Sequence, residues 1–440
     1  MIAQILFTLI LLAGIGYFWS NVSKAIRNVK LGKPSHRDDR KDERLRNMLL
    51  KSFGQQKMFK RPIPALLHLT VYLGFIIINI EVLEIVIDGV FGTHRVFAPL
   101  GGLYNFLIGA FEILAILVIV AVIIFWLRRN ILKLLRFNMP EMKGWPKNDA
   151  NIILYFEMVL MSAFLTMNAA DYKLQLLKYG HYHFKDGIVG SFPISHFIAN
   201  FLPTDPHSLV MIERGAWWFH IIGILIFLNY LYFSKHFHIL LAFPNTYYAK
   251  LPPLAKFENL ESVKNEVALM MDPNADPYAA PVEQAEEPDR FGAKDIFDLE
   301  RIYLLNAYTC TECGRCTDVC PANQTGKKLS PRKIMMDVRD RMEEVGKNID
   351  KNGSFIDDGK SLLDYISKEE LWACTTCNAC VEECPVENDP LDIIIAVRQY
   401  LVMEESAAPT ELNMTFSNIE NNGAPWQYSQ MDRLNWVDED

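Results

Sequence analysis

The chain has 440 residues, enough for two or three domains; half of them are hydrophobic and 22% are charged. The long apolar runs lie almost entirely before residue 245, whereas most of the acidic surplus behind the net charge of −8 lies after it. This asymmetry excludes a single uniform soluble domain and predicts an apolar first half joined to a polar second half.

Five windows in the first half are long enough to cross a hydrocarbon core, which takes a helix of about 20 apolar residues. The first window has no basic residue before it and no small-residue cleavage site after it, so we interpret it as a retained helix rather than a signal peptide. Together the windows predict a membrane domain over residues 1–245. The expected spans are residues 2–19, 64–87, 103–127, 152–170 and 215–233.

Basic residues in the loops predict the orientation of these helices. Residues 24–61 carry 13 Lys and Arg against four Asp and Glu, and residues 128–147 carry six more basic side chains, so both loops are expected in the cytoplasm. The loops at 88–102 and 171–214 are poor in Lys and Arg and are expected outside. The prediction is a multi-pass protein of the inner (plasma) membrane, with its N-terminus outside and its second half in the cytoplasm.

Histidines stand at the second and fifth apolar segments. His68 lies near the start of the second span, and His220 and His238 are 18 residues apart in a fifth segment that we expect to be one continuous helix. Such a helix turns by about 100° per residue, so it would carry both on one face, about 27 Å apart. This arrangement suggests axial haem ligands; the alternative is polar residues at a membrane boundary. His236 would point the other way, as a solvated neighbour of Lys235.

This membrane half, with “SKHFH” at the end of its fifth segment, resembles the cytochrome b subunit of respiratory nitrate reductase and the similar membrane halves of heterodisulfide-reductase-type complexes. In that family the second helix supplies two histidines ten residues apart. Ile78 stands ten residues after His68. The resemblance therefore implies one haem b between His68 and His238, and it leaves His220 without a partner on the second helix. A second haem at His220 would need a loop histidine instead: His94, His181, His183, His196 or His207.

Carboxylates also occur inside the predicted spans. Glu81 and Glu84 lie three apart toward the outer end of the second span, and Glu112 and Glu157 lie in the third and fourth. Acidic side chains in membrane helices often mark proton paths, here to or from a quinone. Hydrogen bonds that pack one helix on another are the simpler interpretation for each single residue.

A proline-rich, acidic segment without apolar periodicity joins the two halves, and we expect residues 246–294 to form an extended linker. The chain has no Gly-rich phosphate loop after a strand, no G-x-S-x-G motif and no basic run interleaved with aromatics. We therefore expect no nucleotide or flavin site, no hydrolase site and no nucleic-acid partner. The basic segment after the first span is expected to contact anionic membrane lipid.

All eight cysteines lie in two copies of C-x2-C-x2-C-x3-C-P, which begin at Cys310 and Cys374. Thiols in the reducing cytoplasm rarely form structural disulfides, and a structural zinc site usually takes its ligands as two separated pairs. Four cysteines packed closely and followed by proline are instead typical of [4Fe–4S] ligation. We therefore predict two [4Fe–4S] clusters.

Helix signals surround the two motifs. Ser330 with Pro331 predicts the start of one helix, Asp389 with Pro390 the start of another, and “SKEE” is a capping box. Residues 295–405 resemble the helical two-cluster ferredoxin of succinate dehydrogenase iron–sulfur subunits and of heterodisulfide-type oxidoreductases. In that family the fourth cysteine of each motif binds the other cluster. The resemblance thus implies one cluster on Cys310, Cys313, Cys316 and Cys384, and another on Cys374, Cys377, Cys380 and Cys320.

The tail, residues 406–440, resembles the segment that leads into cysteine-rich CCG modules in single-chain iron–sulfur oxidoreductases. No CCG triplet occurs in the sequence, so we expect that module on a partner chain. Trp426, Arg433 and Trp436 would then anchor the partner, because aromatic and Arg side chains dominate interface energetics. A disordered tail is the alternative.

The sequence thus predicts an all-α protein, with a five-helix cytochrome b-like bundle followed by a cytoplasmic two-cluster ferredoxin domain. It would be the electron-transferring subunit of a quinone-linked oxidoreductase of a respiratory chain, and it is not expected to be catalytically complete alone. Electrons would pass between a CCG-type subunit or electron-transfer-flavoprotein-type donor, the clusters, haem b and quinone. The alternative is a haem-free, membrane-anchored ferredoxin that acts as scaffold and relay for another membrane subunit, which Ile78 favours. A redox-sensing transporter would need discontinuous polar helices, which we do not find in the sequence.

Overall fold

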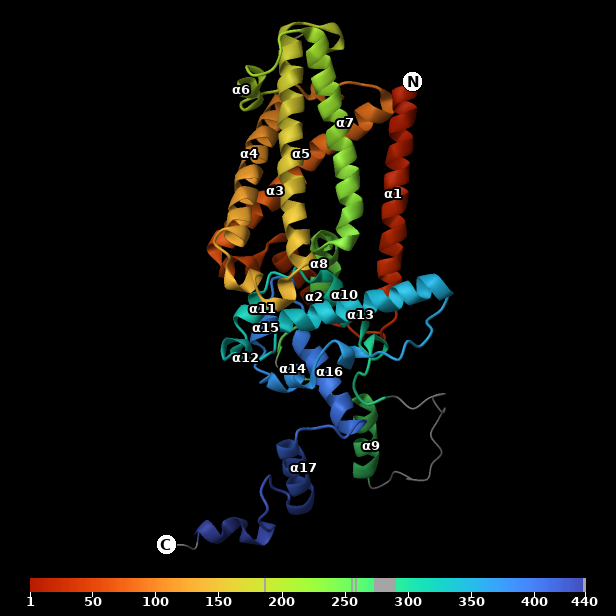
Figure 1. Cartoon of the computed structure of the whole chain (residues 1–440), viewed down its shortest axis with the longest axis vertical. Helices are drawn as coiled ribbons and strands as arrows, with labels where there is room; N and C mark the ends of the chain where they lie inside the picture. The colour runs from red at the N-terminus through yellow and green to blue at the C-terminus, as the bar shows by residue number, and fades with distance from the viewer. Residues whose placement is uncertain (186, 255, 258, 273–289, 438–440) are drawn as a thin grey trace.

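The computed structural model describes residues 1–185, 187–254, 256–257, 259–272 and 290–437. This part of the chain is all-helical, as predicted, and it contains no strand beyond an isolated bridge between Lys33 and Glu300. Five long helices stand side by side, and a group of shorter helices packs against one end of them (Figure 1). The N-terminus lies at the opposite end of the bundle, which we call the distal end, and α17, Thr410–Asn422, projects beyond the shorter helices.

The five long helices are long and apolar enough to cross a membrane. The first four extend past the predicted spans because polar turns continue each helix beyond its apolar stretch, whereas the fifth begins earlier than predicted and ends at Tyr230. Their outer faces carry exposed apolar side chains such as Leu12, Leu66 and Phe106, which are 62%, 64% and 69% exposed. Such a surface is expected against lipid. The helices are α1 Ile2–Val29, α3 Pro62–Phe91, α4 Gly102–Asn130, α5 Trp145–Leu176 and α7 Pro206–Tyr230.

Close helix crossings build the bundle. Helix α5 contacts α4, α7 and the short α6, Ser195–Ala199, while α3 packs on α4 and α1 packs on both α3 and α7. A methyl group at Gly74 would lie 2.5 Å from Val118, and one at Gly223 would lie 2.6 Å from Leu160. Small residues are therefore required at these two crossings, as is common between membrane helices.

The fifth segment is not one continuous helix, contrary to the expectation from its apolar run. Helix α7 ends at Tyr230, and two 3₁₀ turns, Leu231–Phe233 and Lys235–Phe237, separate it from α8, His238–Tyr247. Between the two turns Ser234 is extended, with φ −120° and ψ 158°. The chain therefore leaves the axis of α7 before it reaches His238.

A buried carboxylate explains this break. Asp149, at the start of α5, accepts a hydrogen bond from the Tyr230 hydroxyl at 2.6 Å and another from the Lys235 backbone N–H at 3.1 Å. Both hydrogen bonds hold the chain after Tyr230 away from the path that a continuous helix would follow. Because of the break, His220 and His238 do not share a helix face, so that part of the expectation is wrong.

The iron–sulfur domain begins with the 3₁₀ turn Ile296–Asp298 and consists of short helices. The predicted caps are present: Ser330 accepts from the Lys333 N–H, “SKEE” forms its capping box, and Asp389 accepts from two N–H groups of its helix. Helix α13 lies across the end of the bundle and reaches under α1 (Figure 1). The helices are α10 Arg301–Thr309, α11 Arg315–Asp318, α12 Pro321–Gln324, α13 Pro331–Asn352, α14 Lys368–Ala373, α15 Ala379–Glu383 and α16 Pro390–Met403.

One hydrophobic core runs from the bundle into the iron–sulfur domain. Leu160 and Phe227 of the membrane helices belong to the same buried cluster as Phe237, Ile334 and Ile393. A second core, around Tyr104, Phe164 and Trp217, fills the distal half of the bundle. Since burial of apolar area is the main favourable term in association, the shared core fixes the iron–sulfur domain on the bundle.

The segments between these parts are also helical in places. Helix α2, Lys41–Met48, follows α1, and α9, Glu261–Met271, lies within the predicted linker. The expectation of an extended linker is therefore wrong for α9, because a run of helix-forming residues is present there. Residues 273–289 of the linker lie outside the described residues.

Candidate electron-transfer site

The two cysteine motifs fold in the same way. In each motif the residues that flank the second cysteine are left-handed: Glu312 and Gly314 with φ of 51° and 71°, and Thr376 and Asn378 with φ of 55° and 64°. The third cysteine then lies on a short helix, α11 or α15, and the fourth follows that helix, directly before a proline. The repeated spacing thus produces the same loop twice.

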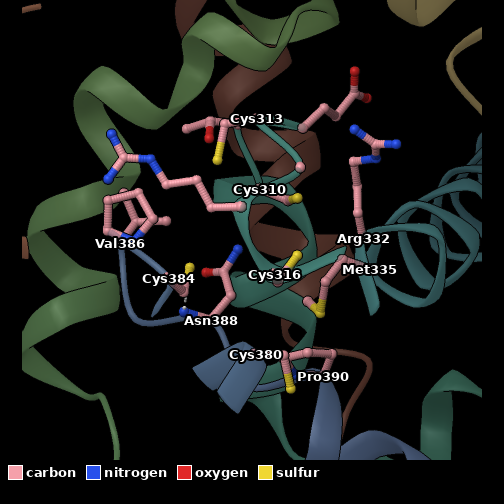
Figure 2. Close-up of a pocket in the computed structure, with 15 residues that line it drawn as sticks. Cys310, Cys313, Cys316, Arg332, Met335, Cys380, Cys384, Val386, Asn388 and Pro390 are labelled. Atoms are coloured by element: carbon pink, nitrogen blue, oxygen red, sulfur yellow. Dashed lines mark hydrogen bonds between the residues drawn. The ribbon is translucent and has the colours of Figure 1, made fainter. Parts of the chain in front are cut away.

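The first three cysteines of the first motif and the last cysteine of the second border one cavity. Figure 2 shows Cys310, Cys313, Cys316 and Cys384 around it; Cys380 also borders the cavity, with its sulfur farther from the other four. Burial, together with the neighbouring thiols of Cys313 and Cys310, raises the pKa of Cys384 to about 12. Metal coordination would remove this proton, since metals bind the thiolate.

The remaining four cysteines form a second group. Burial raises the pKa of Cys380 well above its usual value, and the nearby groups Asp389, Cys374, Cys320 and Cys377 raise it further. Cys320 of the first motif therefore lies with the second motif, just as the last cysteine of the second lies with the first. The structure brings the thiols together in the crossed arrangement, and their roles as ligands stay a prediction.

The first cavity suits an anionic group. Arg332 borders it fully buried, donates to Glu141 at 2.6 Å and to the Arg136 carbonyl at 2.5 Å, and keeps its Nε without a partner. Gly314 makes room for this cation, because a Cβ there would lie 2.3 Å from Arg332 Nη1. Among the described residues, no group of three or more His, Cys, Asp or Glu side chains is close enough together to bind one single metal ion. A buried cation beside four thiols fits an iron–sulfur cluster with thiolate ligands.

The structure also brings His68 and His238 together, with ring centroids 6.4 Å apart. His68 Nδ1 lies 3.0 Å from Gln55 Oε1 and His238 Nδ1 lies 2.9 Å from the Lys235 carbonyl, so each ring donates from Nδ1 and leaves Nε2 available. Metal-ligating histidines are usually oriented in this way. The two rings are thus close enough to bind one group together, and their role as ligands stays a prediction.

His220 has different surroundings. It is buried, its Nδ1 lies 3.0 Å from the Leu160 carbonyl, and its ring packs against Phe164. In the part of the chain that the structure describes, no histidine ring contacts that of His220. Of the loop histidines, His94 packs against His181 with centroids 5.1 Å apart. The pairing that a second haem would require is thus not formed at His220.

His236 is not the solvated residue that the sequence suggests. Its ring lies 5.5 Å from both Phe227 and His238, and burial lowers its pKa well below the usual value. Lys235 is likewise buried, because the helix break turns its side chain inward.

Lys235 connects the histidine turn to the first cysteine motif. It forms an ion pair with Glu312 and donates to the Pro146 carbonyl at 2.6 Å, and Arg339 donates to the same Glu312 at 2.7 Å. Burial alone would raise the pKa of Glu312, but Lys235 and Arg339 lower it to about 2. The carboxylate is therefore ionised and holds both cations at the boundary between the two domains.

A chain of asparagines makes a second connection. Asn245 of α8 is fully buried, donates to the Val386 carbonyl at 2.7 Å and to Asn388 at 2.9 Å, and accepts from Asn306 at 2.8 Å. The Asn388 N–H in turn donates to the Cys384 sulfur at 3.2 Å. Sequence reasoning missed these residues and Glu312, because no spacing marks them; an asparagine in an otherwise apolar segment was the one available signal.

Two of the four membrane carboxylates that the sequence singles out, Glu84 and Glu112, have structural partners. Glu84 accepts from the Phe97 N–H at 2.9 Å and the Tyr104 hydroxyl at 2.8 Å. Glu112 accepts from two backbone N–H groups at the start of α6, at 2.9 and 3.0 Å. For these two residues the hydrogen bonds support the simpler interpretation, helix packing. Glu157 is half-buried on α5.

The predicted docking anchors of the tail are exposed. Trp426 and Trp436 are 45% and 73% exposed, and Arg433 is exposed beside them. They belong to the segment that follows α17, and this segment lies far from the bundle (Figure 1). Contact with a partner stays a prediction, and residues 438–440 lie outside the described residues.

Comparison with known proteins identifies the cysteine-rich region. Residues 309–388 match the family model of the 4Fe–4S dicluster domain. The chain is 30% identical to a probable iron–sulfur-binding oxidoreductase, FadF, of Bacillus subtilis, over 100% of this chain and 61% of the relative. It is 26% identical to the EtfAB:quinone oxidoreductase of Syntrophomonas wolfei, over 92% of this chain and 55% of the relative. The chain thus spans about three fifths or less of these relatives.

Other matches are shorter. A probable membrane-anchored ferredoxin of Chromohalobacter salexigens is 33% identical over 36% of this chain and 26% of its own length. Heterodisulfide reductase subunits match the chain over similar or shorter stretches. No solved structure matches the chain. Its relatives are therefore iron–sulfur oxidoreductases, and it contains a 4Fe–4S dicluster domain.

Proposed function

We propose that this chain is a membrane-bound electron-transfer subunit that links a soluble redox partner to quinone. Cys310, Cys313, Cys316 and Cys384 would hold one [4Fe–4S] cluster, and Cys374, Cys377, Cys380 and Cys320 the other. His68 and His238 would hold a haem b. When bound, these groups would accept and release single electrons.

The observation that carries the proposal is the position of the histidine pair. His68 and His238 lie at the end of the bundle against which the iron–sulfur domain packs, with Nε2 free on both rings. Lys235 with Glu312, and Asn245 with Asn388, connect the segment around His238 to the cysteine loops. Such fixed connections would hold the redox groups at constant separations.

The names of the relatives support the choice of partner and quinone. The EtfAB:quinone oxidoreductase supports an electron-transfer flavoprotein as donor and quinone as the membrane substrate. The heterodisulfide reductase relatives are named as subunits, which supports assembly with a further chain; a CCG-type iron–sulfur module is the alternative soluble partner in our proposal. The basic loops on the iron–sulfur side place this domain in the cytoplasm in our proposal, with the N-terminus outside an inner membrane.

Optical spectroscopy tests the haem. We would record the dithionite-reduced minus air-oxidised spectrum of the detergent-purified protein, of His68→Ala, and of His36→Ala as a control at an exposed histidine. We expect sharp b-type bands in the wild type and in the control, and their loss in His68→Ala. Broad iron–sulfur bleaching should be equal in all three, which shows that the variants are folded.

The second candidate is a haem-free, membrane-anchored ferredoxin, and the relative of that name favours it, as does Ile78. Its five helices would serve as anchor and scaffold for another membrane subunit. A wild-type spectrum with iron–sulfur bleaching alone would decide for this candidate and against the cytochrome.

A further inference from the structure

A second cavity lies at the distal end of the bundle, far from the cysteines. Helices α3, α5 and α7 and the loop after α3 enclose it, and it has room for ordered water. Its walls are strongly polar for a place between membrane helices. Charged groups on the wall include Glu81, Glu84, Arg95, Asp171, Glu213 and Arg214.

Most of these charges have partners. Arg95 forms an ion pair with Asp171, and Arg214 forms one with Glu213. The Tyr182 hydroxyl also donates to Glu213, at 2.6 Å. Glu84 has the hydrogen bonds from Tyr104 and Phe97 already described, so its position on α3 is fixed.

Glu81, about one helical turn before Glu84, is different. It is only 4% exposed, and its Oε2 has no hydrogen-bond partner. His94 Nε2 and Asp171 Oδ1, also beside the cavity, lie 3.4 Å from each other and form a pair. Buried polar atoms in native proteins are almost always satisfied, if not by protein then by ordered water. The unpartnered Glu81 Oε2 on the wall of a polar cavity with room for water therefore points to bound water.

The electrostatic surroundings favour a neutral Glu81. The charged groups that act on it are Arg95, Glu84, Glu112 and Asp171, and Arg95 is already paired with Asp171. A buried carboxylate without its own cation is costly, above all between membrane helices. Glu81 is therefore expected to hold a proton that water can reach. The other charged or titratable groups on the wall are Asp88, His94, Glu213 and Arg214.

We propose that this cavity is a proton-exchange site in which Glu81 carries a proton between cavity water and the interior of the bundle. The inference rests on the proposed quinone reaction, because reduction of a quinone to a quinol takes up two electrons and two protons. The soluble partner supplies the electrons. In each proton transfer the Glu81 O–H bond breaks, the proton passes through water to a carbonyl oxygen of the quinone that is being reduced, and cavity water returns a proton to the carboxylate. Quinol oxidation runs these steps in reverse.

Infrared spectroscopy of the full-length protein tests the site without turnover. We expect a carbonyl band of a protonated carboxyl group that shifts quickly when H2O is exchanged for D2O. Glu81→Gln should lose this fast-exchanging band, while Glu411→Gln, the same change at an exposed residue of α17, should keep it. If Glu81→Gln does not accumulate, Glu81→Asp should shift the same band without removing it. A wild type without the band, or a variant at position 81 that leaves it unchanged, overturns the inference.

Reaction with a short-chain naphthoquinol separates this inference from the proposed function. We would mix the oxidised protein with the quinol and follow reduction of its chromophores, at equal iron content in all variants. We expect Glu81→Gln to slow the reaction at least tenfold, because a lost proton-transfer group typically costs about 10²- to 10⁴-fold, and Glu411→Gln to leave the rate unchanged. A wild type that does not react contradicts the quinone function, and the infrared result alone then decides on the exchange site. A wild type that reacts no faster than Glu81→Gln contradicts the inference alone.

Discussion

At the scale of single residues, Arg341 shows how the iron–sulfur domain is held together. Its side chain is fully buried on α13 and donates to Asp295 and to Asp358, each at 2.6 Å, and to the Lys360 carbonyl at 3.1 Å. Removing one partner of such a buried pair typically costs about 3–5 kcal/mol, because the other charge is left without compensation. Arg341 therefore ties three separate segments of the domain into one unit.

This pairing predicts how stability depends on pH. The hydrogen bonds from Arg341 lower the pKa of Asp358 below its usual value. A carboxyl group of this kind stabilises the folded state above its unfolded pKa of about 4, and that contribution is lost as the pH falls through the lower folded pKa. We expect urea midpoints of the wild type to fall more steeply below about pH 4 than those of Asp358→Asn. Asp357→Asn, at an exposed neighbour without an Arg contact, should retain the wild-type slope, and equal slopes in all three proteins would contradict the assignment.

At the scale of elements, the break between α7 and α8 decides where His238 lies. We expect Asp149→Ala, which removes the acceptor of the Tyr230 and Lys235 hydrogen bonds, to loosen this turn and lower the ratio of haem to iron–sulfur iron at least twofold. The measurement is quantitative haem and iron analysis of the purified protein. Asp205→Ala is a matched control, because Asp205 caps the other end of α7 by accepting from the Ser208 N–H at 2.8 Å. Loss of that cap should cost about 1 kcal/mol of stability and leave the ratio unchanged; an equal fall in both variants would contradict the role of the turn.

The same break shows what the sequence can predict. Caps at Ser330 and Asp389 and the loops of both cysteine motifs depend on neighbouring residues, so local patterns predict them correctly. The break at Ser234 depends on Asp149, which lies on another helix. The hydrophobic periodicity of the fifth segment therefore cannot predict this break. Similarly, the crossed pairing of the fourth cysteines is predicted by the family resemblance and not by the spacing of the motifs.

At the scale of the whole molecule, the iron–sulfur domain and the bundle form one body. In addition to the shared core, Arg61 before α3 pairs with Asp318 at 2.6 Å and with Glu383 at 2.9 Å, so one side chain from the membrane half contacts both cysteine motifs. Lys250 after α8 pairs with Asp392 at 2.9 Å. Each partly exposed ion pair of this kind contributes only about 0–1 kcal/mol to stability. Together the pairs specify how the iron–sulfur domain is oriented on the bundle.

The orientation of this body across the membrane is the last prediction. Basic residues are concentrated in the loops beside the iron–sulfur domain, and this pattern predicts that this side faces the cytoplasm and the distal end faces outside. Phe201 at the distal end and Leu135 at the cytoplasmic end are 89% and 78% exposed, so a cysteine at either position should be equally reactive once reached. In intact cells, a membrane-impermeant maleimide should label Phe201→Cys but not Leu135→Cys, and permeabilised cells should show both. The parent chain controls for the exposed native Cys377. If the distal end faces outside, the distal cavity exchanges protons with the outer aqueous phase. The opposite labelling pattern would contradict the predicted orientation, and the cavity would then exchange protons with the cytoplasm.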